Sequence, residues 1–123
     1  MSGKNILLIE DDLQFHKFVK LALESEGFSV TSASNGLTAS HYLETHTPDL
    51  IITDLLMPEK DGVRLITEVK MSHPDTPVIA MSGGQSAFSP AFLEAAGTLG
   101  ATYTLDKPFD CEQLLELVAK CFD

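Results

Sequence analysis

The chain alternates short apolar runs with longer segments of helical periodicity, and this alternation limits the possible folds more than any other feature. The runs are NILLI (5–9), FSVTS (28–32), LIIT (50–53), VIAM (78–81) and TYTL (102–105). Short β-branched or apolar runs bounded by Gly, Pro or Asp are typical of strands. Because LIIT and VIAM are apolar at almost every position, we expect strands that are buried on both faces, as in parallel sheets covered by helices.

Five other segments show the i, i+3, i+4, i+7 spacing that is typical of amphipathic helices. The first spans residues 15–22, and Asp11 or Asp12 stands in place to cap its start. The others lie at 36–46, 63–69, 88–99 and 111–122. Strands that alternate with helices predict an α/β fold with one doubly wound parallel sheet. Ligands of such sheets bind beyond the carboxyl ends of the strands.

Length and charge narrow the class of protein. The 123 residues suffice for one domain with a core, so we expect a single domain at 1–123, ordered over about 4–122, with no output domain. The formal net charge of −10 disfavours nucleic acid as a partner, because phosphate binding needs a basic face. No apolar stretch suits a signal peptide or a membrane span, so we expect a cytoplasmic protein without membrane contact.

Polar residues follow four of the five predicted strands at their carboxyl ends. They are Glu10 and Asp11, Asp54, Ser82, and Lys107. Each one alone has an ordinary explanation as a turn, cap or solvated residue. Because the carboxyl ends of parallel strands share one edge of the sheet, we expect all five side chains to lie together. Three converging carboxylates repel one another without a counter-ion, and oxygen ligands in this number suit Mg²⁺, for which Mn²⁺ is expected to substitute.

Four stretches, in order, resemble the CheY-like receiver domain of two-component response regulators. They are ILLIEDD, DLLMPEKDG, MSG and GATYTLDKPF, and the resemblance covers essentially the whole chain. It implies a flavodoxin-like fold, with a five-stranded sheet in the order 2-1-3-4-5 flanked by five helices. It also implies a phosphorelay signalling protein rather than an enzyme, which receives a phosphoryl group from a sensor histidine kinase or a histidine phosphotransfer protein.

The resemblance gives the acidic residues separate roles. Asp54 is expected to be the phosphoacceptor and a metal ligand. Asp11 is expected to bind Mg²⁺ directly, Glu10 to act through water, and Leu56 to contribute its backbone carbonyl. Asp12 follows the acidic pair and is expected to cap a helix. Phosphorylation of an aspartate needs no general base, because the carboxylate is already an anion at neutral pH.

The remaining matches concern the phosphoryl group and the surrounding turns. Ser82 is expected to contact the phosphoryl oxygens through its hydroxyl. Lys107 is expected to pair with the carboxylate before transfer and with the phosphoryl group afterwards. The bond before Pro108 resembles the cis peptide of the family, a geometry that is confined almost entirely to proline. Pro58 and Gly62 are expected to have structural roles.

The segment expected to act as a switch departs from the family pattern. Receivers commonly carry an aromatic residue three positions before the lysine, where this chain has Thr104. Tyr103 lies one place earlier, and since strand side chains alternate between faces, it is expected on the opposite side of the sheet. A second part of the expected switch is the loop after Ser82, which begins with Gly83 and Gly84. These glycines relax the backbone, and we expect this loop to move on phosphorylation because it directly follows Ser82.

Other interpretations of the sequence stay open at this point. A pseudo-receiver, which is a protein-interaction module that is no longer phosphorylated, is compatible with Thr104. A hydrolase of the haloacid-dehalogenase type would need a second aspartate two residues after Asp54, where Leu56 stands. A flavodoxin-like FMN protein would need a Ser/Thr/Gly-rich phosphate loop after the first strand. If the chain is a receiver, we expect it to act on a downstream protein effector, which the sequence does not identify. We also expect the chain to be a monomer or a weak dimer.

Overall fold

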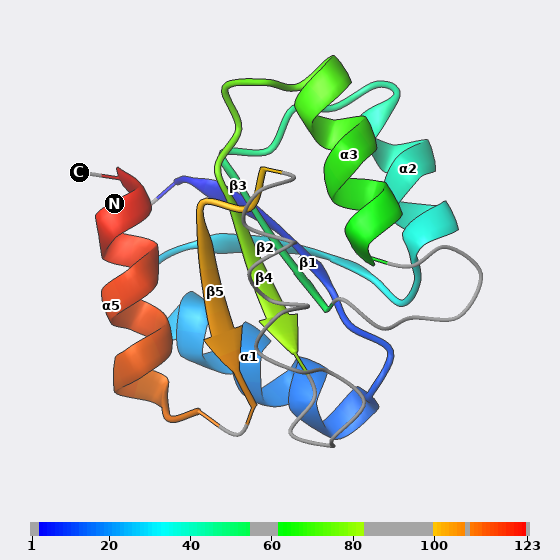
Figure 1. Ribbon diagram of the computed structural model, residues 1–123. Coiled ribbons are helices and arrows are strands. Elements are labelled where there is room, and N and C mark those ends of the chain that lie inside the picture. The colour runs from blue at the N-terminus through cyan, green and yellow to red at the C-terminus, as the bar shows by residue number, and fades with distance from the viewer. Residues whose placement is uncertain (1–2, 55–61, 83–99, 108, 123) are drawn as a thin grey trace.

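The fold is a single parallel sheet with helices on both faces (Figure 1), seen in a computed structural model that describes residues 3–54, 62–82, 100–107 and 109–122. The strands are β1 (Asn5–Ile9), β2 (Ser29–Ala33), β3 (Leu50–Asp54), β4 (Val78–Ser82) and β5 (Tyr103–Asp106). They are ordered β2-β1-β3-β4-β5, and every neighbouring pair is parallel. The predicted fold class and strand order are therefore confirmed.

Four of the five predicted helices lie within the described residues. They are α1 (Leu13–Ser25), α2 (Gly36–Leu43), α3 (Gly62–Ser72) and α5 (Cys111–Phe122). The predicted helix at 88–99 falls outside the described part of the chain. The second helix ends at Leu43 rather than at residue 46. Its continuation is disfavoured by Pro48, which pushes the preceding residue away from helical geometry.

The central strands are buried on both faces, as their apolar sequences predict. In β1, Ile6 and Leu8 face a core shared with α1 and α5, whereas Leu7 faces a second core shared with α2 and α3 (Figure 1). In β3, Ile52 and Ile51 divide between the two cores in the same way. All five side chains have zero exposed surface. The two cores together hold the carboxyl ends of the strands at one rigid edge.

Helix caps place the starts of α1 and α5 close to that edge. The side chain of Asp12 accepts a hydrogen bond from the backbone N–H of Phe15 at 3.0 Å, so the predicted capping role of Asp12 is confirmed. At α5, Asp110 and Gln113 bond reciprocally to each other's backbone N–H groups, at 2.7 and 3.0 Å, which is a capping box. These contacts fix where the chain turns after β1 and β5.

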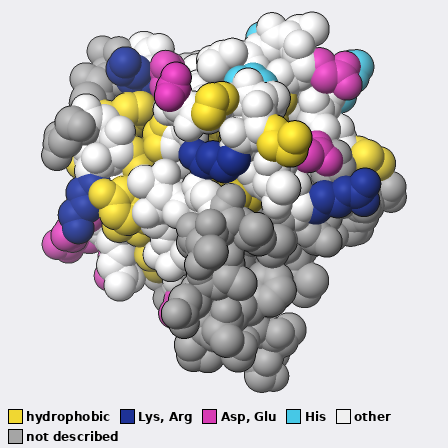
Figure 2. Space-filling view, turned by 45° about the horizontal axis from the view of Figure 1, so that its top comes forward, with side chains coloured by type: hydrophobic (Ala, Val, Ile, Leu, Met, Phe, Trp, Pro, Cys, Tyr) yellow, Lys and Arg dark blue, Asp and Glu magenta, His cyan; other side chains and the backbone are white. Residues whose placement is uncertain are grey.

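Figure 2 shows the molecule with the amino ends of the strands turned toward the viewer. On this face the visible Lys and Arg side chains lie apart from one another, and Asp and Glu side chains lie among them. Charged groups are therefore dispersed here, in contrast to the clustering at the carboxyl ends described below. Among the described helices, none has the length and apolar character that crossing a bilayer requires.

Candidate functional site

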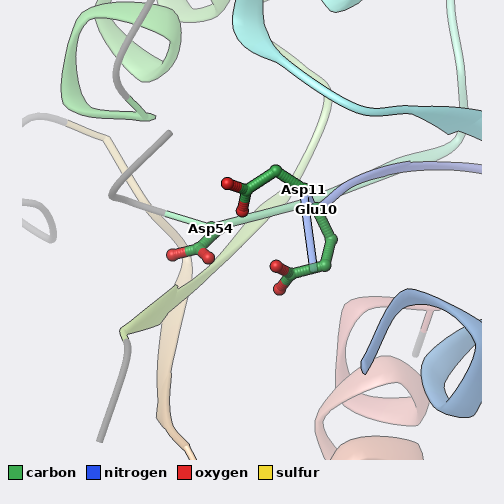
Figure 3. A group of neighbouring side chains, drawn as sticks. All are labelled: Glu10, Asp11 and Asp54. Atoms are coloured by element: carbon green, nitrogen blue, oxygen red, sulfur yellow. The ribbon is translucent and has the colours of Figure 1, made fainter. Parts of the chain in front are cut away.

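Three carboxylates from two adjacent strands converge at the carboxyl edge of the sheet. Glu10 and Asp11 follow β1, and Asp54 ends β3, which pairs with β1 up to Ile9 and Thr53. One oxygen from each carboxylate lies within 4.8 Å of the others, and Figure 3 shows the three groups pointing into a common space. Glu10 is 1% exposed and Asp54 is 5% exposed, whereas Asp11 is open to solvent. The expected convergence of the three carboxylates is therefore present.

Lys107 follows the edge strand β5, and its side chain extends into this cluster. Its Nζ donates to Oδ2 of Asp54 at 3.0 Å and to Oε1 of Glu10 at 2.5 Å. The lysine follows β5, which is separated from β1 by β3 and β4, and its side chain is only 14% exposed. The pairing with Asp54 was expected, but the pairing with Glu10 was not. Lys107 therefore joins the two buried carboxylates with one cation.

Glu10 is held at both of its carboxylate oxygens. Oε1 accepts from Lys107, and Oε2 accepts from the backbone N–H of Asp12 at 3.0 Å. Burial nevertheless raises the pKa of Glu10 to about 7, since the two hydrogen bonds only partly offset it and the charge of Asp54 raises it further. Burial also lowers the pKa of Lys107, but hydrogen bonds to Glu10 and Asp54 outweigh this effect and leave the pKa above its ordinary value.

The raised pKa of Glu10 predicts that metal-free protein loses stability as the pH rises from 4.5 to about 7. In this range the folded state still holds the proton that the unfolded state has released, so stability is largest below the unfolded pKa. The free energy of unfolding is expected to fall by up to about 3 kcal/mol. Urea unfolding in EDTA across this range measures it. Glu10→Gln should lack the fall in the free energy of unfolding that Glu10 causes. Parallel pH profiles for the native protein and Glu10→Gln would contradict the prediction.

Of the other expected site residues, the structure describes only some. Ser82 ends β4 opposite Asp106 of β5, and the preceding Met81 lies opposite Asp54, so the backbone of Ser82 reaches the same edge. Gly62 is the first residue of α3. The other expected residues of the site and its turns lie outside the described part of the chain: Leu56, Pro58, Gly83, Gly84 and Pro108.

Tyr103 and Thr104 lie on opposite faces of the sheet. Tyr103 packs against the core that lies between the sheet and helices α1 and α5. Thr104 is exposed and pairs with Ala80, whose side chain belongs to the other core. The tyrosine therefore does not replace an aromatic residue at position 104.

Two residues of α1 that the sequence did not mark as site residues lie close to the site. The ring centroid of Phe15 lies 4.4 Å from Nζ of Lys107. Nδ1 of His16 lies 3.1 Å from the carbonyl oxygen of Glu10, and its Nε2 lies 2.7 Å from Oγ of Ser32. Because a carbonyl only accepts, Nδ1 carries the proton of that bond. The helical spacing of the sequence marked Phe15 only as a core residue.

The donor set of this site fits a hard divalent cation. It offers three carboxylates against one ammonium, and two of the carboxylates are shielded from water. Oxygen ligands of this kind suit Mg²⁺, which keeps several waters and uses few protein carboxylates. The negative charge left over after pairing with Lys107 gives such an ion a physical reason to bind.

Comparisons with known proteins agree with this geometry. The family described as "Response regulator receiver domain" matches residues 6–119. The chain is 32% identical over 120 residues to the DNA-binding transcriptional regulator NtrC of Rhizobium meliloti (strain 1021), covering 98% of the chain and 24% of that protein. It is 35% identical over 109 residues to the transcriptional regulatory protein KdpE of Staphylococcus aureus (strain NCTC 8325 / PS 47), covering 89% of the chain and 46% of that protein. The chain thus spans a quarter to a half of the length of these relatives.

Solved structures show the same fold. The receiver domain of the Francisella response regulator 1452 superposes with a TM-score of 0.88 at 28% identity, covering 98% of this chain and 97% of that one. The chemotaxis response regulator CheY4 of Vibrio cholerae gives a TM-score of 0.86 at 27% identity, covering 96% and 98%. With the acidic cluster, the paired lysine and the strand order all in agreement, the chain belongs to the response regulator receiver domain family.

Proposed function

We propose that this chain accepts a phosphoryl group on Asp54 in a Mg²⁺-dependent reaction and signals through contact with a protein effector. The observation that carries the proposal is the environment of Asp54. Its carboxylate is almost fully buried, bonds to Lys107 at 3.0 Å, and lies beside the carboxylates of Glu10 and Asp11. Phosphorylation and magnesium binding are typical of receiver domains, and these domains are signalling modules rather than classical enzymes.

The proposed step forms one bond and breaks one. A carboxylate oxygen of Asp54 forms the new P–O bond while the P–N bond of a phosphohistidine breaks, and the electron pair of that bond stays on the imidazole nitrogen, which then takes a proton. Lys107 lies where it can neutralise the phosphoryl oxygens during transfer. A bound Mg²⁺ would supply further neutralisation at the same oxygens. The rest of the work is positioning, which the rigid edge of the sheet provides.

The hydrogen bonds of Glu10 support an indirect role toward the metal. Both of its oxygens already accept hydrogen bonds, one from Lys107 and one from the Asp12 N–H. We therefore assign direct metal contact to Asp11 and Asp54, and contact through water to Glu10. A carbonyl ligand from Leu56 and a hydroxyl contact from Ser82 complete the proposed site on the strength of the family resemblance.

The proposed partners follow from the family. Receiver domains interact with histidine kinases or phosphotransfer proteins, and one of these is the proposed phosphoryl donor. NtrC is named as a DNA-binding regulator, of which this chain matches a quarter. For this chain we propose output by contact with a protein effector, in the cytoplasm, with Gly83 and Gly84, which lie outside the described residues, as proposed switch positions.

Incubation with acetyl phosphate and Mg²⁺, followed by intact-mass spectrometry, tests the proposed function. The native protein is expected to gain the mass of one phosphoryl group, and Asp54→Asn is expected to gain none. Asp49→Asn is the matched control, because Asp49 is an exposed aspartate at the opposite end of β3 that accepts a hydrogen bond from the Asn5 N–H. It should be modified like the native protein.

Two results would overturn the proposal. One is a modified Asp54→Asn variant, which would move the phosphoacceptor elsewhere. The other is a native protein that stays unmodified by acetyl phosphate and by phosphorylated histidine kinases, which would favour the pseudo-receiver alternative. Addition of EDTA is expected to abolish the modification of both the native protein and Asp49→Asn.

A further inference from the structure

Three aromatic rings gather beside Lys107. Phe15 and Phe18 come from α1, and Phe109 lies between β5 and α5. The ring of Phe15 meets that of Phe109 edge-on, with centroids 5.1 Å apart and planes 83° apart. Phe18 lies 5.8 Å from Phe15 and 6.3 Å from Phe109. Because edge-to-face contacts are directional, Phe109 holds the plane of the Phe15 ring in place.

The ammonium of Lys107 lies between this ring and the two buried carboxylates. Nζ donates to Glu10 and Asp54, and it lies 4.4 Å from the centroid of Phe15. An ammonium has three N–H groups, and two of them are used by the carboxylates. The aromatic ring covers part of the remaining side, in agreement with the low exposure of the lysine at 14%. A cation over an aromatic ring is attracted by the negative charge of the ring face.

We propose that Phe15 is a positioning residue for Lys107, which holds the ammonium against Asp54 through a cation–π contact. A lysine has a flexible four-carbon stem and a strongly hydrated charge. Besides its two bonds to carboxylates, the ammonium of Lys107 has the ring of Phe15 as a third contact, on the side that faces away from Glu10 and Asp54. An aliphatic side chain at position 15 would fill space but would offer no negative ring face. The effect on phosphoryl transfer rests on the proposed function, whereas the contact itself does not.

A positioning role makes a different prediction from a purely structural one. Loss of ring packing alone would lower the melting temperature and leave the rate of phosphorylation unchanged. Loss of positioning would change the NMR resonances of Lys107 and slow phosphorylation. It would leave the acetyl phosphate concentration at half-maximal rate unchanged, because Phe15 does not touch the donor. Phe18 provides a control, because it belongs to the same aromatic group while Phe15 makes the contact with Lys107.

The test uses Phe15→Leu, Phe15→Tyr and Phe18→Leu in the full chain. The first readout is the side-chain NMR shift of Lys107 in unphosphorylated protein, where the Phe15 ring current should move the protons next to Nζ upfield. Phe15→Leu should lose this shift and reduce the maximal rate of phosphorylation by about 3- to 10-fold, the range expected for one cation–π contact. Phe15→Tyr should restore both, and Phe18→Leu should keep both.

An unchanged Lys107 shift in Phe15→Leu would overturn the inference, as would a lost shift with an unchanged rate. If Phe15→Leu does not fold, Phe15→Met takes its place with the same expected outcomes. If the native protein accepts no phosphoryl group at all, the proposed function fails, and the Lys107 shift then decides whether Phe15 contacts the ammonium, which is the part of the inference that does not rest on that function.

Discussion

Magnesium is expected to raise the melting temperature of the native protein by roughly 10 °C when its free concentration is about 100 times its dissociation constant. We expect the ion to bind the folded state, because only folding brings the carboxylates of Asp11 and Asp54 together from two strands. Removal of one ligand should therefore remove most of the response. Asp11→Asn and Asp54→Asn are expected to respond only weakly. In metal-free buffer Asp11→Asn should melt above the native protein, since it relieves repulsion among the carboxylates.

Asp12→Ala is the matched control for the magnesium response. Asp12 is adjacent in sequence to the proposed ligands, but its side chain caps α1. Its loss should lower stability by about 1 kcal/mol and leave the magnesium response intact. Calorimetry in EDTA and in MgCl₂ measures all four proteins. Equal magnesium-induced shifts in the melting temperatures of the native protein, Asp11→Asn and Asp54→Asn would contradict the proposed metal site.

Replacement of Lys107 by methionine is expected to affect both stability and chemistry. The change leaves Glu10 and Asp54 buried without their shared cation, and loss of one partner of a buried pair costs about 3 kcal/mol. This loss applies to the metal-free protein, and bound Mg²⁺ should reduce it. Phosphorylation by acetyl phosphate is expected to slow by about 100-fold, as for removal of one preorganised charge-stabilising donor.

Lys17→Met is the control, because it removes the same charge from an exposed position of α1. Urea unfolding should place it within about 0.5 kcal/mol of the native protein. A double-mutant cycle with Glu10→Gln sharpens the test. If Lys107 mainly compensates the charge of Glu10, then Lys107→Met should cost much less in the Glu10→Gln background. Equal costs in both backgrounds would contradict the pairing seen between Lys107 and Glu10.

Local patterns predicted the elements of the fold with good accuracy. The runs at 5–9 and 50–53 became β1 and β3, because continuous apolar residues suit strands that are covered on both faces. The predicted helix at 36–46 extends beyond the observed end of α2 at Leu43, because helical spacing does not reflect the effect of Pro48. The order of the strands came from the family resemblance, because alternation of strands and helices is compatible with several orders.

The cluster of acids followed from chain order, whereas its internal pairing did not. Any parallel sheet brings residues that follow its strands to one edge, so the order of strands and acids along the chain predicts the grouping of Glu10, Asp11 and Asp54. The ion-pair partner of a lysine depends on the direction in which its long side chain extends. Lys107 extends from the edge strand to Glu10, and no spacing along the sequence encodes that contact. The same holds for the Phe15 ring beside it.

Periodicity and the positions of strand ends are local properties, and the amino-acid sequence alone therefore defines the layers of this protein and the edge where its acidic side chains gather. Burial, by contrast, depends on every element that packs around a group. The raised pKa of Glu10 and the placement of the Lys107 ammonium between carboxylates and an aromatic ring arise only when distant segments exclude water from the same small space.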